Sequence, residues 1–157
     1  MPIIPTASHI GIQKSDKDSD DTTVNENIKK ARRAMYSLMG TGLHGENGLD
    51  SKTSISIIRT YILSILTYGL EILLPKGKTL NNISIQNKKW IKQILSLNSN
   101  VADSAVYTLS GLLPIETVIH VKAINLFGNI SRAKCDSIER QLQIKPHNSH
   151  SWFIEIK

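Results

Sequence analysis

TSISIIRTYILSILTYGLEILL, residues 53–74, is the stretch that decides the fold of this 157-residue chain. Its apolar side chains occupy nearly every side of a helix with 3.6 residues per turn, and a helix that is apolar all round is typical of a buried core helix. The run is about as long as a membrane span, but Arg59 and Glu71 interrupt it. A charge at mid-span costs roughly 3 kcal/mol on insertion scales. We therefore expect one central core helix over 53–74, ended by Pro75.

The composition is that of one ordinary globular domain with a basic surplus. Hydrophobic residues make up 40% of the chain, and 19 Lys and Arg outnumber 13 Asp and Glu. The single cysteine, Cys135, excludes an intrachain disulfide and fits a reducing compartment. The N-terminus has neither the basic region nor the long apolar region of a signal peptide. These features predict a cytoplasmic or nuclear protein that is not secreted and does not insert in a membrane.

The basic charge is concentrated in the middle of the chain. Residues 14–21, KSDKDSDD, are acidic and polar, whereas residues 25–100 hold eleven basic and four acidic residues. Nucleic acid is a common partner of such a basic region, but a basic face that is only solvated is equally common. Charge alone leaves both interpretations open.

The apolar spacing on either side of the central stretch predicts further helices. Thr23 and Glu26 have the spacing of a capping box, so a helix is expected to start there and to end near Gly40. Thr79 is the expected N-cap of another helix that runs to about Leu97. Later segments predict helices over 103–109, 115–133 and, with a weaker pattern, 136–144.

Residues 8–12, SHIGI, alternate loosely and predict a short strand that Pro2 and Pro5 keep extended. A lone strand cannot satisfy its own backbone, and no later segment has the alternation of a partner strand. We therefore predict an all-α bundle of five or six helices with a stray N-terminal strand. The expected parts are a strand, an acidic loop, a helical domain and a partly ordered helical tail, over 1–13, 14–22, 23–133 and 134–157.

The sequence does not converge on a catalytic centre. Its acidic residues are scattered outside 16–21, and that polar segment has no scaffold to hold two carboxylates around a metal. Cys135 has no evident partner as a nucleophile, and it has no recognised zinc spacing to any histidine. We expect no metal, cofactor or small-molecule ligand in this chain, and a stand-alone enzyme is the least supported class of function. The histidines are His9, His44, His120, His147 and His150.

Two of the predicted helices carry basic ladders opposite an apolar stripe. Lys and Arg on a rigid helix face can contact successive phosphates, which positions a duplex without reading its sequence. Tyr36 and Trp90 could stack on bases, although Trp90 has the spacing of a core residue. The alternative is a helical protein-interaction module whose basic faces are merely solvated. The candidate nucleic-acid-binding residues are Lys29, Lys30, Arg32, Arg33, Lys88, Lys89 and Lys92.

Several motifs in combination resemble the downstream part of non-LTR (LINE-type) retrotransposon reverse transcriptases, and the similarity covers nearly the whole chain. A strand that ends in Leu-Gly or Ile-Gly closes the palm in that family, and a helical thumb follows it. The thumb has a helix rich in Lys, Arg and Ala, and then a long helix with the pattern Y-G-x-E. The matching segments are HIGI (9–12), IKKARRAMYSLMGTGLHGENGL (28–49), TYILSILTYGLEILL (60–74), AVYTLSGLLPIETVIHVKAINLFGNI (105–130), QLQIK (141–145) and SHSWF (149–153).

This resemblance implies a thumb that clamps the template-primer duplex of an RNA-directed DNA polymerase. The primer grip would fall at His9, Ile10, Gly11 and Ile12, and the KKARR ladder would face an RNA–DNA or DNA duplex. Tyr68, Gly69 and Glu71 match the family pattern and are expected to be structural, with a basic residue of a neighbouring helix as the partner of Glu71.

The catalytic part of the family pattern is missing from this chain. The F/Y-x-D-D turn and the third aspartate, which hold Mg²⁺ in the parent polymerase, have no match in the sequence. We therefore expect the chain to be inactive alone and to need the palm and fingers of its parent.

Overall fold

The structure is a computed structural model, and it describes residues 6–9, 12–15, 19–43, 48–133, 137–138 and 140. The chain divides into two compact units, Met1–His120 and Val121–Lys157. The first unit holds both strands and all of the helices except most of the last one, which continues into the second unit. All of the basic residues proposed above lie in the first unit.

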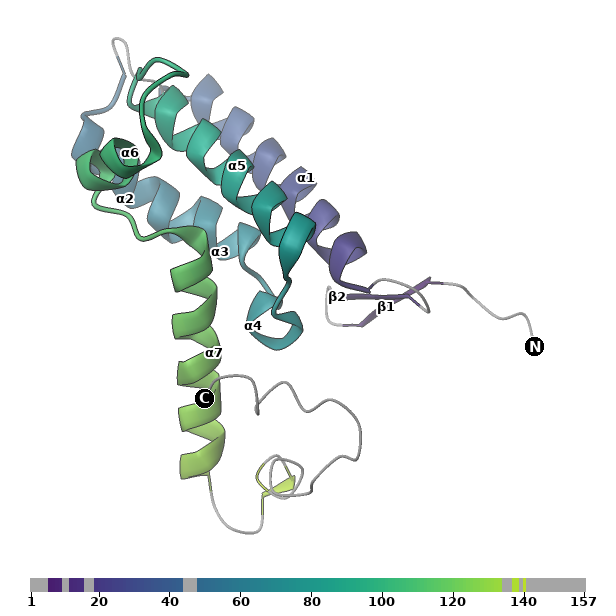
Figure 1. Cartoon of the computed structure of the whole chain (residues 1–157). Coiled ribbons are helices and arrows are strands. Elements are labelled where there is room, and N and C mark those ends of the chain that lie inside the picture. The colour runs from purple at the N-terminus through teal and green to yellow at the C-terminus, as the bar shows by residue number, and fades with distance from the viewer. Residues whose placement is uncertain are drawn as a thin grey trace. The chain divides into compact units, whose positions relative to one another are not determined.

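Helices make up most of the described chain (Figure 1). The fold is all-α apart from one small sheet, which confirms the predicted class. In chain order the elements are β1 (Thr6–His9), β2 (Ile12–Ser15), α1 (Ser19–Gly40), α2 (Ser51–Ile57), the π-helical segment η1 (Ile58–Ile62), α3 (Leu63–Leu66), α4 (Leu70–Leu73), α5 (Gly77–Ile94), α6 (Asp103–Ser110) and α7 (Ile115–Arg132).

The core of the first unit lies where α1, α5 and the α2–η1–α3 segment meet. Figure 1 shows α1 and α5 side by side, and α3 contacts α1 while α2 contacts α5. The apolar stripes predicted for both long helices face this core. Their fully buried members are Val24, Ile28, Ala31 and Met35 of α1, and Ile83, Trp90, Ile91 and Ile94 of α5.

The stretch 53–74 is helical, but the prediction of one continuous helix is wrong. The α2–η1–α3 segment runs to Leu66, the chain then turns, and the short α4 follows. Gly69 ends the turn with φ 73°, a left-handed conformation that glycine adopts without strain. Asn27 of α1 donates its amide to the carbonyl oxygens of Leu66 (3.4 Å) and Tyr68 (2.8 Å). A buried side chain therefore satisfies carbonyl groups that the break leaves without a helical partner.

The stretch 53–74 is also buried on one side only, and not all round as predicted. Ile58, Ile62 and Leu66 face the core, whereas Tyr61 and Tyr68 are exposed. Its hydroxyl groups return to the helix backbone: Thr60 donates to the carbonyl of Ser56 (2.9 Å), and Ser64 donates to that of Thr60 (2.7 Å). Each hydroxyl group thus has its hydrogen-bond acceptor within its own helix. It needs no partner from another element, whether its position is buried or exposed.

α1 and α5 both begin earlier than predicted. The first begins at Ser19, so residues 19–22 of the expected acidic loop are helical and Thr23 is a buried helical residue. Glu26 accepts from Lys29 (2.8 Å), so its carboxylate serves an ion pair in place of a capping box. The helix that was expected to start after Thr79 begins at Gly77, and the Thr79 hydroxyl donates to the carboxylate of Asp21.

The N-terminal strand has a partner in this chain, contrary to the prediction. β1 pairs with β2 in an antiparallel register that matches Thr6 with Ser15 and His9 with Ile12. Residues 14 and 15 therefore belong to a strand and not to the expected loop. Period-two alternation is absent from IQKS, which explains why the partner was missed. The hairpin contacts α1 through β2.

The last described helices match the prediction closely. α6 spans Asp103–Ser110 and ends at Gly111, whose φ is 61°. α7 begins after Pro114, as expected. The tail motifs QLQIK and SHSWF, and most of the weak helix expected over 136–144, lie outside the described residues.

Candidate nucleic-acid interface

The basic ladder of α1 faces solvent, but its four members do not form one row. Lys29, Lys30, Arg32 and Arg33 are all exposed. Residues two apart on an α-helix point about 200° apart, so Lys30 and Arg32 project to opposite flanks. Lys29 and Arg33 are one turn apart and share the solvent side of the helix. Arg32 lies on the flank next to α5, where its Nη2 donates to Gln86 Oε1 at 3.4 Å.

The three basic residues predicted on α5 lie next to two different helices, α1 and α6. Lys89 is exposed on the side next to α1, and among the described residues it has no hydrogen-bond or ion-pair partner. Lys88 and Lys92 lie on the other side and are half-buried. Asp103, the first residue of α6, accepts from Lys88 Nζ at 2.6 Å and lies 3.7 Å from Lys92 Nζ. Lys92 also donates to the backbone oxygen of Ser99 (2.8 Å).

Lys88 and Lys92, which were predicted to contact nucleic acid, are thus engaged by Asp103. The hydrogen bond from Lys88 lowers the pKa of the Asp103 carboxyl, and the same bond raises the pKa of Lys88. Both groups therefore stay charged at neutral pH and partly neutralise each other. Of the three, Lys89 is the lysine that remains open.

Sequence reasoning missed Asp103 as a partner because it treated α5 alone. The chain turns back within a few residues after Ile94, which brings the start of α6 beside the last turns of α5. An acidic residue in the first turn of a helix is favourable by itself, because the helix dipole is positive there. The sequence signal that could have indicated this pairing is a short connection after α5 that leads directly to an acidic residue.

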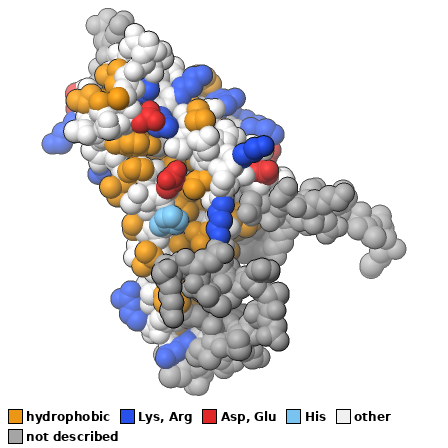
Figure 2. All heavy atoms as spheres, in the orientation of Figure 1, with side chains coloured by type: hydrophobic (Ala, Val, Ile, Leu, Met, Phe, Trp, Pro, Cys, Tyr) orange, Lys and Arg blue, Asp and Glu red, His pale blue; other side chains and the backbone are white. Residues whose placement is uncertain are grey.

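We call Lys29, Arg32 and Arg33 of α1, together with Lys89 of α5, the α1–α5 basic surface. α1 and α5 are adjacent in the fold, so residues more than fifty positions apart in the chain lie on one face. Figure 2 shows Lys and Arg side chains gathered over these two helices. The face also carries one acid, Glu26, whose bond from Lys29 lowers its pKa.

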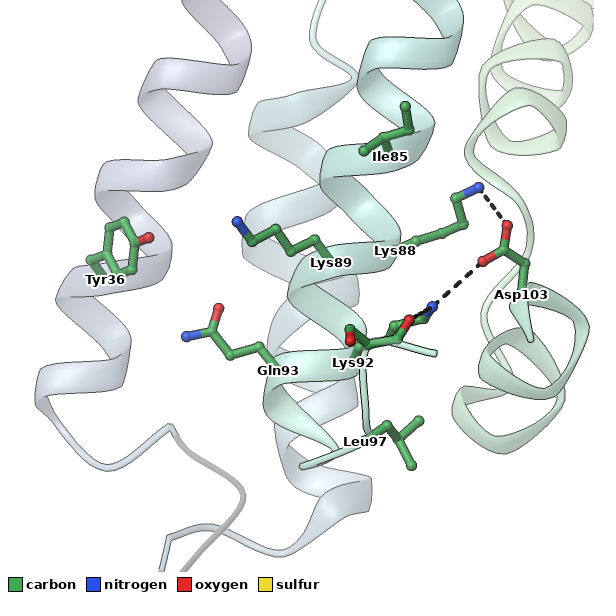
Figure 3. Close-up of a pocket in the computed structure, with 9 residues that line it drawn as sticks. Tyr36, Ile85, Lys88, Lys89, Lys92, Gln93, Leu97 and Asp103 are labelled. Carbon is green, nitrogen blue, oxygen red and sulfur yellow. Dashed lines mark hydrogen bonds and ion pairs between the residues drawn. The ribbon is translucent and has the colours of Figure 1, made fainter. Parts of the chain in front are cut away.

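A shallow depression of about 660 Å³ runs over the outer side of α5, and we call it the α5 depression. Figure 3 shows Lys89 and Gln93 extending from α5 toward Tyr36 on α1, and Lys88 and Lys92 extending toward Asp103 on the opposite side. Ile85, Leu97 and Ser99 complete the lining. The depression thus has a basic wall with an aromatic ring on one side and a neutralised ion-pair network on the other.

The two aromatic candidates for base stacking have opposite outcomes. Trp90 is 3% exposed and packs in the core, as its spacing predicted. Tyr36 is 57% exposed and lines the α5 depression. A ring with both an accessible face and neighbouring cations can stack on a base, so Tyr36 remains a candidate and Trp90 does not.

The residues predicted as a primer grip are only partly described. His9 and Ile12 are paired in the backbone register of the two strands, while Ile10 and Gly11 lie outside the described residues. The side chain of Ile12 packs against Gly69 at the break that follows α3. The hairpin is therefore fixed to the helical segment that carries the Y-G-x-E pattern.

The two charged residues of the stretch 53–74 have different surroundings. Arg59 donates through Nη2 to the backbone oxygen of Gly111 (3.1 Å), at the C-terminal end of α6. Glu71 Oε2 is buried, and within the described part of the chain it accepts no hydrogen bond. The expected basic partner of Glu71 from a neighbouring helix is thus not seen there.

The described residues contain no cluster suited to metal binding. No group of three or more His, Cys, Asp or Glu side chains converges among them. His120 is exposed on α7, whereas His44, His147, His150 and Cys135 lie outside the described part. No single described helix is long and apolar enough to cross a membrane, although α6 and α7 meet that criterion together as a bent pair.

Comparisons with known proteins identify no relative of this chain. No protein-family model, no curated protein and no solved structure matches it.

Proposed function

We propose that this chain corresponds to the thumb-like part of a non-LTR retrotransposon RNA-directed DNA polymerase, a reverse transcriptase, and that it binds the template-primer duplex. The contact would be made by the α1–α5 basic surface. The sequence motifs suggest the family, and the adjacency of α1 and α5 is the single structural observation that carries the binding proposal. No polymerase centre is proposed, because the sequence lacks the F/Y-x-D-D motif.

The geometry supports phosphate contacts better than base contacts. The four cations of the α1–α5 basic surface are exposed, and both helices that carry them are held by a buried core. Cations fixed on rigid helices can neutralise backbone phosphates, and each neutralised phosphate releases counterions. Four such contacts give an affinity that falls with roughly the third to fourth power of the salt concentration. Binding of this kind positions a duplex and does not select its sequence.

The hairpin and the break after α3 are also consistent with this proposal. In the family that the sequence resembles, the strand with the Ile-Gly motif grips the primer next to the thumb. The packing of Ile12 on Gly69 ties β2, the strand that follows this motif in the chain, to the helical segment. Such a connection would hold a primer strand and a duplex clamp in a fixed relation.

A charge-reversal experiment with a matched control tests the proposal. The test variant is Arg32→Glu with Lys89→Glu, which removes two cations from the α1–α5 basic surface. The control is Lys52→Glu with Lys78→Glu, which makes the same change in net charge at exposed sites in the first turns of α2 and α5. Affinity for a labelled RNA–DNA hybrid hairpin is measured over a range of salt concentrations, and helix content is checked by circular dichroism.

The test variant is expected to lose about tenfold or more in affinity and to flatten the salt dependence by about two powers. The control is expected to lose far less, because it changes only the overall field. Equal losses in both variants would mean that the chain is attracted by net charge alone. The absence of hybrid binding by the unaltered, helical chain would reject the proposal.

The alternative function, a helical protein-interaction module, is favoured by one observation. Asp103 neutralises Lys88 and Lys92, so this half of the α5 ladder stabilises the junction with α6. If the other basic residues contact only solvent, reversal of their charge would leave the affinity for the hybrid hairpin unchanged. The charge-reversal experiment therefore distinguishes the two functions.

A further inference from the structure

We infer that the α5 depression is a stacking site for one unpaired nucleotide base, with the ring of Tyr36 as the platform. The inference rests on the proposed function, because it names the form of nucleic acid that this part of the surface binds. It adds a contact that a duplex lying on the α1–α5 basic surface would not make.

The position of Tyr36 is the first reason. Its side chain is 57% exposed although it belongs to a long helix whose other side is buried. It follows Arg32 by one helical turn, which is about 6 Å along α1. An exposed aromatic ring beside a cation is the arrangement with which proteins hold single-stranded nucleic acid, because the base stacks and the cation meets the adjacent phosphate.

The residues that face Tyr36 are the second reason. Lys89 and Gln93 extend toward it from α5 (Figure 3). Lys89 has no partner within the described chain, so its ammonium group is open to a phosphate. The amide of Gln93 offers both a donor and an acceptor to the edge of a base. A platform, a cation and an amide therefore converge from two helices on the same space.

The shape and charge of the depression set the orientation of the ligand. Its volume of about 660 Å³ lies within the range of sites that hold small organic molecules, roughly 300–1,000 Å³. On the opposite wall the ammonium groups of Lys88 and Lys92 are engaged by Asp103, whereas Lys89 extends toward Tyr36 and is open. A phosphate therefore meets Lys89, and the base lies against Tyr36.

The stacking site selects unpaired over paired nucleotides. Inside a duplex both faces of a base are covered by its neighbours, so an internal base pair cannot stack on Tyr36. A single strand, or an unpaired end next to a duplex, has a free face. The depression therefore binds single-stranded nucleic acid, while the exposed cations of α1 bind phosphates of either form.

The test compares three variants against two probes. Tyr36→Ala removes the ring, Tyr36→Phe keeps it, and Tyr61→Ala removes a tyrosine of η1 that is equally exposed, at 61%, and does not line the depression. The probes are a short labelled oligothymidine, which stays unpaired, and a blunt RNA–DNA hybrid hairpin whose two strands are joined by a non-nucleotide linker, so that it has no unpaired base. Affinities are measured at low ionic strength by fluorescence anisotropy, and folding is checked by circular dichroism.

Tyr36→Ala is expected to weaken oligothymidine binding about fivefold or more, since stacking on an aromatic side chain contributes that much per base. Its affinity for the blunt hairpin should stay within about twofold, because phosphate contacts are unaffected. Tyr36→Phe and Tyr61→Ala should behave as the unaltered chain with both probes. Unchanged oligothymidine binding by Tyr36→Ala, or an equal loss in Tyr61→Ala, would overturn the stacking site.

The two probes separate this inference from the proposed function. Hairpin binding by the unaltered chain, with no effect of Tyr36→Ala on oligothymidine, rejects the stacking site and leaves the duplex proposal intact. Ring-dependent oligothymidine binding without hairpin binding rejects the duplex proposal and leaves the stacking site. Binding of neither probe rejects both.

Discussion

Ile12 occupies the space beside Gly69 into which any other side chain would project. A Cβ atom added to Gly69 would lie 2.9 Å from Ile12 Cγ1 and 3.0 Å from its Cδ1. Gly69 also has φ 73°, so it is required both for its backbone conformation and for the close approach of the hairpin. One glycine thus ends the turn between α3 and α4 and lies against the N-terminal hairpin.

Gly69→Ala is expected to destabilise the chain by about 1–3 kcal/mol, because it adds backbone strain and a clash at one site. Gly40→Ala is the control, since Gly40 has no atom within 4 Å of an added Cβ and no positive φ. Urea unfolding followed by circular dichroism measures both. Equal stability of the two variants would show that the hairpin does not press on Gly69 in solution.

Asn27 is expected to be the polar residue of α1 that matters most for stability. Asn27→Leu keeps most of the side-chain volume but leaves the carbonyl groups of Leu66 and Tyr68 without their donor, at a cost of about 1–3 kcal/mol. The exposed Asn25 lies two residues away on the same helix, so Asn25→Leu is a matched control. Thermal unfolding of both variants is the measurement, and a stable Asn27→Leu variant would contradict the assigned role.

Asp103→Asn should strengthen nucleic-acid binding. The change releases Lys88 and Lys92 from their ion pairs, so two more cations can meet phosphates beside the α1–α5 basic surface. We expect a severalfold gain in affinity for the hybrid hairpin and a salt dependence steeper by up to about two powers. The control is Asp50→Asn, which removes one exposed acid before α2 and keeps a side chain that can cap that helix. A gain of equal size in the control would assign the effect to net charge.

The same ion pair predicts a pH window of stability. The pKa of Asp103 is lowered by the hydrogen bond from Lys88, so its stabilising contribution is present above the unfolded value near 3.9 and is lost as the pH falls through the lowered folded value. The pKa of Lys88 is raised by the same bond, so its contribution is present below about 10.4 and is lost as the pH rises through the raised value.

Comparison of the unaltered chain with Asp103→Asn in urea at several pH values tests this window. The unaltered chain should be slightly more stable from about pH 5 to pH 9, and the difference should vanish at strongly acidic pH. The difference should be small because Asp103 is half exposed, and solvent screens such pairs. A difference that persists below the lowered pKa of Asp103 would exclude the carboxylate as its source.

Arg59→Gln should loosen the end of α6. The guanidinium of Arg59 donates to the backbone oxygen of Gly111, and a cation at a helix C-terminus also favours the helix dipole. We expect a loss of about 0.5–1.5 kcal/mol in the free energy of unfolding. Hydrogen exchange of the α6 amides should increase locally, whereas α1 amides should not respond. Uniform acceleration in both helices would point to global destabilisation.

The sequence by itself determined the class of fold and the buried faces of the long helices. Val24, Ile28, Ala31 and Met35 recur at helical spacing, and this periodicity records which side of α1 loses contact with water. The same reasoning separated the buried Trp90 from surface positions. Local signals also located Gly111 and Pro114 between the last two helices, because these residues act through their own backbone.

Only the tertiary structure decided which polar groups meet. The break after Leu66 depends on Asn27, thirty-nine residues earlier in the chain, and its hairpin contact depends on Ile12. The division of the α5 ladder depends on Asp103, which belongs to the next helix. A hydrogen bond or ion pair between distant segments leaves no periodicity in the sequence, because its partners are brought together by the burial of apolar side chains elsewhere. Hydrophobic spacing therefore gave the helices and their inner faces, whereas the open cations and the exposed ring of the candidate site follow from how the helices pack.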